Sequence, residues 1–368
     1  MKALAEKFYG PIPARALPAR FRVEEPESFT ARRLLLTDPS QHLASWERYY
    51  LAPSYLKASG REAYALDLLA QILADEAGDP ESIAGKAWMQ LMLAGHPDGR
   101  GLKGTPKSIA AITAADLHGF VGERFARDNL LVTVVGDITP ASLAPLLYKT
   151  FGGLPAKADM PATAEARIPP AGGIAVVTQD IPQSVVYFGE AGLKREEPDY
   201  YAAALLDVIM GGGSLDSRLG DAIREKRGLV YSVGTDLLSY DHAALIFGSL
   251  ATKNASVGEA ITILKAEWKR MGESGPTAQE LADAKTYLIG SYPLNFTSSQ
   301  RTAGALLAQR LEGLPIDYID RRVALFERVT LADAARVAKR LYRADSLRLL
   351  VVGKPHDLPG DLAPPALE

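Results

Sequence analysis

The stretch Gly211-Gly-Gly-Ser-Leu-Asp-Ser-Arg-Leu-Gly-Asp-Ala-Ile-Arg-Glu-Lys-Arg-Gly-Leu-Val-Tyr-Ser-Val-Gly234 decides how the second half of this chain folds. We expect an apolar helix before the triple glycine and an amphipathic helix after it, ending at Gly228, a typical left-handed C-cap. From Leu229 the apolar period changes to two, which predicts a strand. This corner between helix and strand places Arg224 and Tyr231 so that a guanidinium and a phenol point into one space.

Two interpretations of Arg224 and Tyr231 follow from their chemistry. Two fixed hydrogen-bond donors can hold a peptide carbonyl or a developing oxyanion. However, an Arg in the last turn of a helix is also favoured by the helix dipole, and a strand Tyr is often half-buried in a core. From these residues alone, the structural interpretation is the better supported one.

The pattern Gly-Gly-Gly, Ser-Arg-Leu, then Ile-Arg-Glu-Lys-Arg-Gly-Leu-Val-Tyr-Ser-Val resembles the C-terminal module of the pitrilysin-type zinc peptidases. This group contains insulin-degrading enzyme and mitochondrial processing peptidase. The resemblance extends over nearly the whole chain and implies that Arg224 and Tyr231 contact the substrate backbone beside the metal. It also implies an α+β fold of two duplicated modules, each an antiparallel or mixed sheet covered by helices, arranged as half of a clamshell.

Composition sets the broad class of the protein. The 368 residues are 47% hydrophobic, enough for two ordinary domains, and contain no Cys, so disulfides and thiolate metal sites are excluded. The net charge of -3, without basic runs, argues against nucleic acid or an anionic membrane as the main partner. No apolar run reaches the length of a membrane span, and the first residues do not resemble a secretion signal. We therefore expect a cytoplasmic protein, or a periplasmic one if a leader was removed.

An internal repeat supports the two modules. The front parts align at 64–73 and 201–210, 137 positions apart, and the back parts align without a gap at 112–136 and 329–353, 217 positions apart. Each back part predicts an amphipathic helix followed by an apolar strand. The difference between the offsets means that the first module is shorter by about 80 residues, missing between Leu73 and Ile112. The missing segment corresponds to the one that carries Arg224 and Tyr231 in the second module.

These alignments divide the chain into a shortened first module, residues 1–150, and a complete second module, residues 151–368. Residues 79–137 resemble the rear of a catalytic N-terminal module of the family, whereas residues 8–73 resemble the front of a C-terminal module. We therefore expect a join between about 73 and 79. The chain is either a naturally shortened relative or a recombined or trimmed form, and the sequence leaves both possibilities open.

The family resemblance also implies which metal ligands to look for. Its peptidases hold zinc with an inverted His-x-x-Glu-His motif and a distant Glu, the motif Glu serving as general base. The predicted helix Glu62–Ala74, which should carry this motif, has no imidazole, and the five histidines are scattered: His42, His96, His118, His242 and His356. Each of them is more simply interpreted as a loop, turn or helix-surface residue. We expect no catalytic zinc in this chain alone, and whether it is an enzyme stays open.

Three functions remain under consideration. The first is a peptidase-family subunit without the zinc motif, which lends Arg224 and Tyr231 to a zinc-bearing homologous partner acting on extended peptides. The second is a structural or assembly protein with a peptidase-like fold and no proteolytic role. The third is a fragment or recombined form of a zinc metalloendopeptidase. Because the shortened module would expose apolar surface, we also expect association with a partner subunit or self-association.

Overall fold

The computed structural model describes residues 79–100, 108, 111–213 and 216–365. The chain divides into two compact units, Met1–Pro53 and Ser54–Glu368, and the described residues all belong to the second. The predictions for residues 8–73, including the helix Glu62–Ala74 and His42, lie outside the described residues. Among the helices that the structure describes, none is long and apolar enough to cross a membrane.

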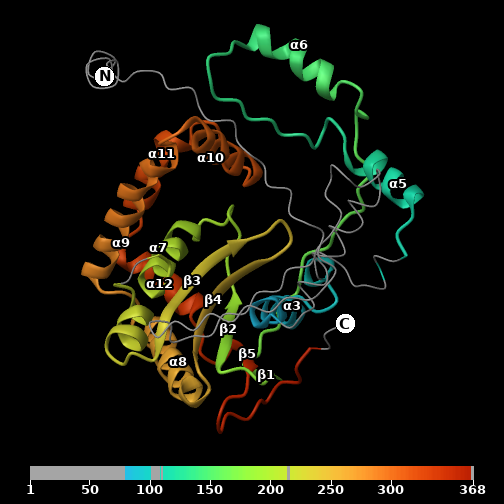
Figure 1. Ribbon diagram of the computed structural model, residues 1–368. Coiled ribbons are helices and arrows are strands. Elements are labelled where there is room, and N and C mark those ends of the chain that lie inside the picture. Colours follow the sequence, from blue (N-terminus) through green and yellow to red (C-terminus); the bar gives the residue numbers. More distant parts are fainter. Residues whose placement is uncertain (1–78, 101–107, 109–110, 214–215, 366–368) are drawn as a thin grey trace, which may run out of the picture. The chain divides into compact units, whose positions relative to one another are not determined.

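A five-stranded mixed sheet organises the second half of the chain (Figure 1). Its strands are β1 (Gly173–Thr178), β2 (Gln183–Ala191), β3 (Val230–Ser239), β4 (Ala244–Lys253) and β5 (Arg348–Gly353). They lie in the order β1-β5-β2-β4-β3, with β1 parallel to β5 and all other neighbours antiparallel. The last strand in sequence therefore lies inside the sheet, and β3 lies at one edge.

Helices precede, connect and follow these strands. They are α3 (Pro80–Met92), α5 (Ala114–Arg124), α6 (Pro140–Phe151), α7 (Tyr200–Met210), α8 (Val257–Ser274), α9 (Ala278–Ser291), α10 (Ser299–Leu311), α11 (Tyr318–Glu327) and α12 (Leu331–Leu341), with short helical turns η1 (Pro97–Gly99), η2 (Gly220–Glu225), η3 (Asn254–Ser256) and η4 (Tyr292–Phe296). The combination of a mixed sheet with many helices is the α+β class that the sequence predicted.

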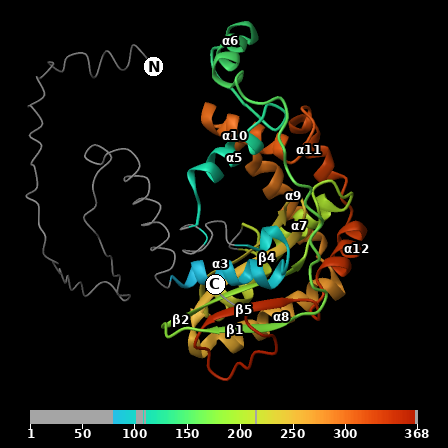
Figure 2. The same ribbon diagram turned by 90° about the vertical axis from the view of Figure 1, so that its right-hand side faces the viewer.

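Apolar side chains cover both faces of the sheet. Along β5, Leu349 and Val351 belong to one core, whereas Leu350 and Val352 belong to another, because successive side chains of a strand point to opposite faces. Helices α7, α8 and α12 pack in the first core, and α3 packs in the second through Trp88 and its neighbours. Figure 2 shows β1, β5 and β2 side by side, with α3 next to them. A strand that is buried on both faces explains the continuous apolar run in β5.

The two copies of the back repeat differ in the structure. Helix α5 lies in the first copy and α12 lies in the second, at an offset of 217, so each copy has the helix that the sequence predicted. The second copy continues into β5, but residues 130–135 of the first copy form no strand, so this part of the prediction was wrong. A strand needs neighbours for its backbone groups, and β5 has β1 and β2 on its two sides. Among the described residues, 130–135 have no such neighbours.

Candidate functional site

The predicted corner between helix and strand is present. The short helix η2 leads through Arg224 to Gly228, whose φ of 61° is the left-handed conformation that the sequence predicted. The Gly228 N–H donates to Arg224 O at 2.8 Å, and the Leu229 N–H donates to Ile223 O at 3.1 Å, which closes the end of the helix. Ile223 is fully buried, so it anchors the corner in the core.

A β-bulge begins strand β3 beside this corner. Val230 pairs with Thr252 and Val233 pairs with Leu250, so two residues of β3 oppose one residue of β4. Tyr231 is one of these two residues, and 89% of its surface is exposed. The expectation that a strand Tyr is half-buried is therefore wrong here, because the bulge interrupts the alternation and turns this side chain out to solvent.

The Arg224 guanidinium lies 5.9 Å from the centre of the Tyr231 ring, at the outer limit of a cation–π contact. The Arg224 side chain is 31% exposed, and its Nε lies 3.6 Å from Glu225 Oε1. The predicted proximity of the two side chains is thus present in the structure. Together they offer the guanidinium N–H groups and one phenol O–H at the exposed start of an edge strand.

An ion pair between a buried arginine and a partly exposed glutamate holds the beginning of the corner in place. Arg218 donates from Nε and Nη2 to the two carboxylate oxygens of Glu280 at 2.6 and 2.8 Å, and also to Gly275 O at 2.9 Å. Burial alone would raise the pKa of the Glu280 carboxyl, but hydrogen bonds from Arg218 and Thr277 outweigh it and lower the pKa to about 2. The pair therefore stays charged over the physiological pH range and ties the corner to α9.

The triple glycine connects α7 to this corner. The N–H groups of Gly211 and Gly212 both donate to Asp207 O, at 2.9 and 2.8 Å. Gly213 has a φ of 105°, which an L side chain rarely adopts, and its carbonyl accepts a hydrogen bond from the Tyr287 hydroxyl at 2.9 Å. Burial raises the pKa of the Asp207 carboxyl to about 7. A hydrogen bond with Thr235 lowers this pKa, but by less than burial raises it.

The structure brings together two histidines that the sequence did not pair. The rings of His96 and His242 lie 6.4 Å apart, and His242 Nδ1 lies 3.6 Å from Glu165. His96 Nε2 is 2.7 Å from Ala164 O, and its Nδ1 accepts from the Asp98 N–H at 3.2 Å, so it is a capping loop residue as predicted. Within the described ranges, no group of three or more His, Cys, Asp or Glu side chains could hold a metal ion.

A cavity of about 420 Å³ beside α10 was missed by the sequence analysis. The buried Arg195 lines it, donating from Nε to Glu312 at 3.0 Å and from Nη2 to the Tyr318 hydroxyl at 2.7 Å. The same guanidinium lies over the ring of Tyr200, 4.1 Å from its centre. More than a hundred positions separate Arg195 from its two hydrogen-bond partners. No local motif therefore signals this cluster.

Comparisons with known proteins agree with the fold. Residues 111–288 match the family model described as "Peptidase M16 inactive domain". A solved structure of a peptidase M16 inactive domain from Pseudomonas fluorescens has a TM-score of 0.74 at 24% identity, covering 83% of this chain and 73% of that one. Residues 111–288 are thus similar to the inactive domain of this peptidase family, and the solved structure shares the fold, which confirms the pitrilysin-type resemblance.

Two relatives show the range of names in the family. An "Uncharacterized zinc protease" of Mycobacterium leprae is 25% identical over 278 residues, which cover 75% of this chain and 62% of that protein. A "Non-peptidase homolog" of Helicobacter pylori is 27% identical over 296 residues, covering 79% of this chain and 67% of that protein. The chain thus spans less than two thirds of the length of the mycobacterial relative.

Proposed function

We propose that this protein is a non-catalytic peptidase-family subunit that holds an extended peptide for a zinc-bearing homologous partner. The observation that carries the proposal is the pair Arg224 and Tyr231, whose side chains lie beside each other, guanidinium 5.9 Å from ring centre, at the exposed start of an edge strand. The inactive-domain match to residues 111–288 supports a role without peptide hydrolysis by this chain.

The geometry of the corner suits peptide binding in two ways. An edge strand has backbone groups that can pair with an extended peptide, which gives affinity without strong side-chain specificity. Arg224 and Tyr231 can then donate to peptide carbonyls at the end of that strand. Because Arg218, two residues before η2, is tied to Glu280 of α9, the backbone that leads to Arg224 is held in place.

The decisive experiment is cleavage of a quenched fluorogenic peptide. This chain is tested alone and then mixed with a homologue from the same source that carries His-x-x-Glu-His. We expect no cleavage and no bound zinc for the chain alone, and cleavage in the mixture. Arg224→Ala and Tyr231→Phe should each lower kcat/KM at least about tenfold, the loss of one good hydrogen bond to the reacting complex.

Matched variants separate substrate binding from folding. Tyr240→Phe changes a tyrosine beyond the far end of β3, and Arg321→Ala removes an exposed arginine on α11, so both should leave cleavage unchanged. Cleavage by this chain alone with one bound zinc would contradict the proposal. So would full activity of the Arg224→Ala and Tyr231→Phe mixtures.

A second candidate function is a structural or assembly role without proteolysis. The "Non-peptidase homolog" among the relatives favours it, since that protein shares 79% of this chain's length at 27% identity. A stable complex that forms in the mixture but never cleaves any peptide would support this function over the first.

A further inference from the structure

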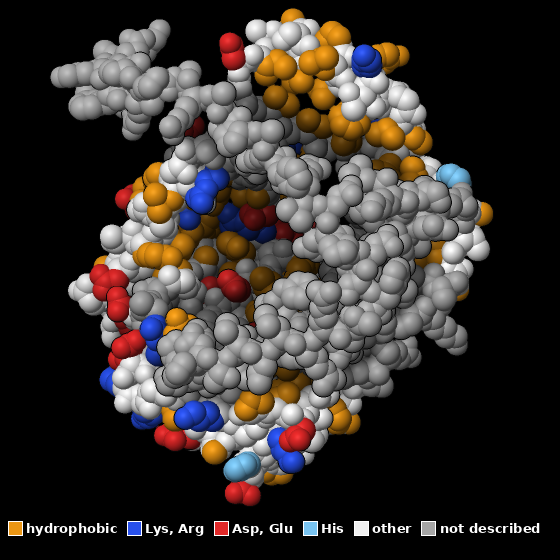
Figure 3. Space-filling view, in the orientation of Figure 1, with side chains coloured by type: hydrophobic (Ala, Val, Ile, Leu, Met, Phe, Trp, Pro, Cys, Tyr) orange, Lys and Arg blue, Asp and Glu red, His pale blue; other side chains and the backbone are white. Residues whose placement is uncertain are grey.

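The cavity of about 420 Å³ beside α10 has a charged and polar wall. The side chains that line it include Arg195, Arg301 and Glu312, together with the hydroxyl-bearing Tyr292 and Tyr318. Figure 3 shows Lys or Arg side chains together with Asp or Glu side chains in a hollow near the position of α10 in Figure 1. These groups suit a polar or charged ligand.

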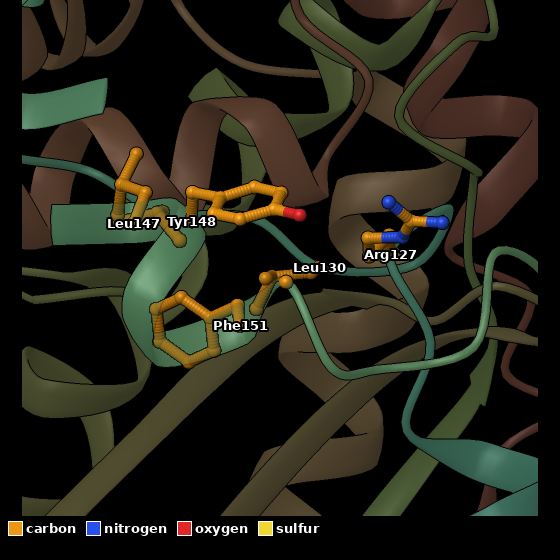
Figure 4. Close-up of a pocket in the computed structure, with 7 residues that line it drawn as sticks. Arg127, Leu130, Leu147, Tyr148 and Phe151 are labelled. Atoms are coloured by element: carbon orange, nitrogen blue, oxygen red, sulfur yellow. The ribbon is translucent and has the colours of Figure 1, made fainter. Parts of the chain in front are cut away.

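A second cavity, of about 250 Å³, has the opposite character. Its wall is mainly apolar and includes Leu130, Leu147 and Phe151, as Figure 4 shows. The Tyr148 hydroxyl points toward Arg127 at one end. The concentration of charge beside α10 is therefore a property of that cavity and not of every hollow in this chain.

Arg195 is a fixed positive charge in the wall beside α10. Its side chain is 8% exposed, whereas that of Glu312, its ion-pair partner, is 47% exposed. The guanidinium is held by Glu312, by the Tyr318 hydroxyl and over the ring of Tyr200. Because these contacts already fix the side chain, little conformational entropy is lost when a ligand binds next to it.

Positive charge exceeds negative charge at this cavity. Arg301 lines the cavity, and Arg322 lies over the ring of Tyr292, 4.0 Å from its centre. With Arg195 these described residues supply three guanidinium groups against the one carboxylate of Glu312, a net charge of +2 (3 − 1). Burial lowers the pKa of Arg322, and the positive charge of Arg195 lowers it further. An anion in the cavity offsets this excess of positive charge.

Hydrogen-bond donors are available beside these charges. Gln309 Nε2 donates to the Tyr292 hydroxyl at 2.7 Å, so the tyrosine keeps its own proton to donate. Asn295 brings a side-chain amide to the wall. Arg301 gives one N–H to Leu294 O at 3.3 Å, and a guanidinium has several more. A carboxylate only accepts hydrogen bonds, so it suits this set of donors.

The cavity lies at the far end of the edge strand that begins at the corner. Ser239 is the last residue of β3, and its Oγ accepts a hydrogen bond from the Arg195 N–H at 2.9 Å. Tyr231 lies eight positions earlier, at the other end of β3. At about 3.3 Å per residue, roughly 26 Å separate the two ends. A peptide extended along β3 therefore needs about eight residues to reach from the corner to the cavity.

We propose that the cavity beside α10 binds a carboxylate group of the peptide that the corner holds. This proposal rests on the proposed function, because it concerns the same peptide. Arg301 and Tyr292 donate to the carboxylate, and Arg195 contributes its fixed charge. A C-terminal carboxylate and an Asp or Glu side chain share this chemistry. The site adds a requirement for negative charge at a set distance, which pairing with a strand does not impose by itself.

Isothermal titration calorimetry of the full chain with three N-acetylated peptides of about ten residues tests the proposal. The peptides share one uncharged sequence and differ in a single group. The first ends in a free carboxylate, the second ends in an amide, and the third ends in an amide but has one Glu next to that end. We expect the first or the third peptide to bind at least about tenfold more tightly than the second. The peptide that does so identifies the source of the carboxylate.

Two substitutions at the cavity change this preference in opposite directions. Arg301→Ala should abolish it, by raising the dissociation constant of the charged peptide to that of the amide. Glu312→Gln keeps an acceptor for Arg195 but removes the negative charge, so it should tighten binding of the charged peptide, which loss of structure does not do. Arg310→Ala is the matched control. Arg310 lies on the same helix and also donates to a backbone carbonyl, Leu314 O at 3.1 Å.

The outcomes separate this proposal from the proposed function. A preference for the charged peptide that is lost in Arg301→Ala, but kept in Arg310→Ala, supports the carboxylate site. Equal affinity of the wild type for all three peptides, or a preference that survives Arg301→Ala, overturns it. The proposed function then still stands if Arg224→Ala weakens binding of the amide peptide. A preference that depends on Arg301, with no effect of Arg224→Ala or Tyr231→Phe on any peptide, contradicts the proposed function instead. A chain that binds none of the three peptides overturns both.

Discussion

Residues 112–136 and 329–353 are two versions of one sequence pattern in different surroundings. Both open with a capping box, in which the Thr113 hydroxyl donates to Asp116 and the Thr330 hydroxyl donates to Asp333, each at 2.6 Å. Both continue into a helix of 11 residues. Beyond the helix they diverge, since only the second copy forms a strand. The difference teaches that the helix is specified by its own residues, whereas the strand depends on its neighbours.

The largest expected effect comes from one substitution made at matched positions. Val351 is fully buried in β5, and its counterpart Val134 is 43% exposed. Val351→Asp buries an unpaired carboxylate, so we expect it to lower the free energy of unfolding by more than about 4 kcal/mol. Val134→Asp should change it by no more than about 0.5 kcal/mol in the monomer.

Urea unfolding followed by tryptophan fluorescence measures both changes, because Trp268 is fully buried in the core between the sheet and α7, α8 and α12. The measurement is made at a concentration below self-association. If Val134→Asp destabilised the chain as strongly as Val351→Asp, the two copies would be equally packed and the comparison would fail.

The next effect concerns pH, and it comes from two carboxyl groups, Glu190 of β2 and Asp116 of the first copy, whose pKa values are shifted in opposite directions. Burial raises the pKa of Glu190 from its ordinary value of 4.5 to about 7, although Trp268 Nε1 donates to this carboxyl at 2.6 Å. Between these two values the folded protein keeps a proton that the unfolded chain has lost. The free energy of unfolding therefore falls as the pH rises from about 4.5 to about 7, by on the order of 3 kcal/mol. Hydrogen bonds from Thr113 lower the pKa of the exposed Asp116, so its contribution is instead lost on acidification.

Unfolding in urea at pH 5 and pH 8 checks this prediction. Glu190→Gln keeps an oxygen for Trp268 but cannot ionise, so the variant should show a smaller fall in stability between the two pH values than the wild type. Glu273→Gln, on the exposed part of α8, is the control and should behave as the wild type does. An unchanged pH dependence in Glu190→Gln would exclude this carboxyl as the cause.

The smallest effect concerns the two helix caps. Thr330→Ala removes the side chain that caps α12, and should destabilise the second module by about 1 kcal/mol. Thr113→Ala removes the same cap from α5, but among the described residues no side chain of α5 belongs to either core. The loss of the cap should therefore lower helicity locally and leave the main unfolding midpoint unchanged. Circular dichroism and the urea midpoint, measured on both variants, separate the two outcomes. Equal shifts of the midpoint would show that α5 unfolds together with the second module.

Most of the second module could be predicted from sequence because its signals are local. The capping serine before α10, the helix end at Gly228 and the change of period at Leu229 each depend on a few adjacent residues. Local signals of this kind do not decide whether the segment after α5 forms the expected strand. Its apolar residues are the same in kind as those of β5, and whether a segment finds neighbouring strands depends on residues far away in the sequence.

The candidate site was predictable in part for the same reason. Arg224 and Tyr231 are seven positions apart, so a helix end followed by a strand start was enough to place them together. The bulge that exposes Tyr231 was not predicted, because it depends on the register between β3 and β4. The cluster of Arg195 with Glu312 and Tyr318 was missed because these residues meet only in the folded chain.

The bulge at the start of β3 separates two kinds of evolutionary constraint. Tyr231 is 89% exposed and contributes little to the core, whereas Leu219 and Ile223, a few positions earlier, are fully buried. Selection for a folded chain acts on the two buried residues, whereas under the proposed function the tyrosine is kept by selection for peptide binding. A lineage released from that binding would let position 231 drift first, while its fold stayed intact.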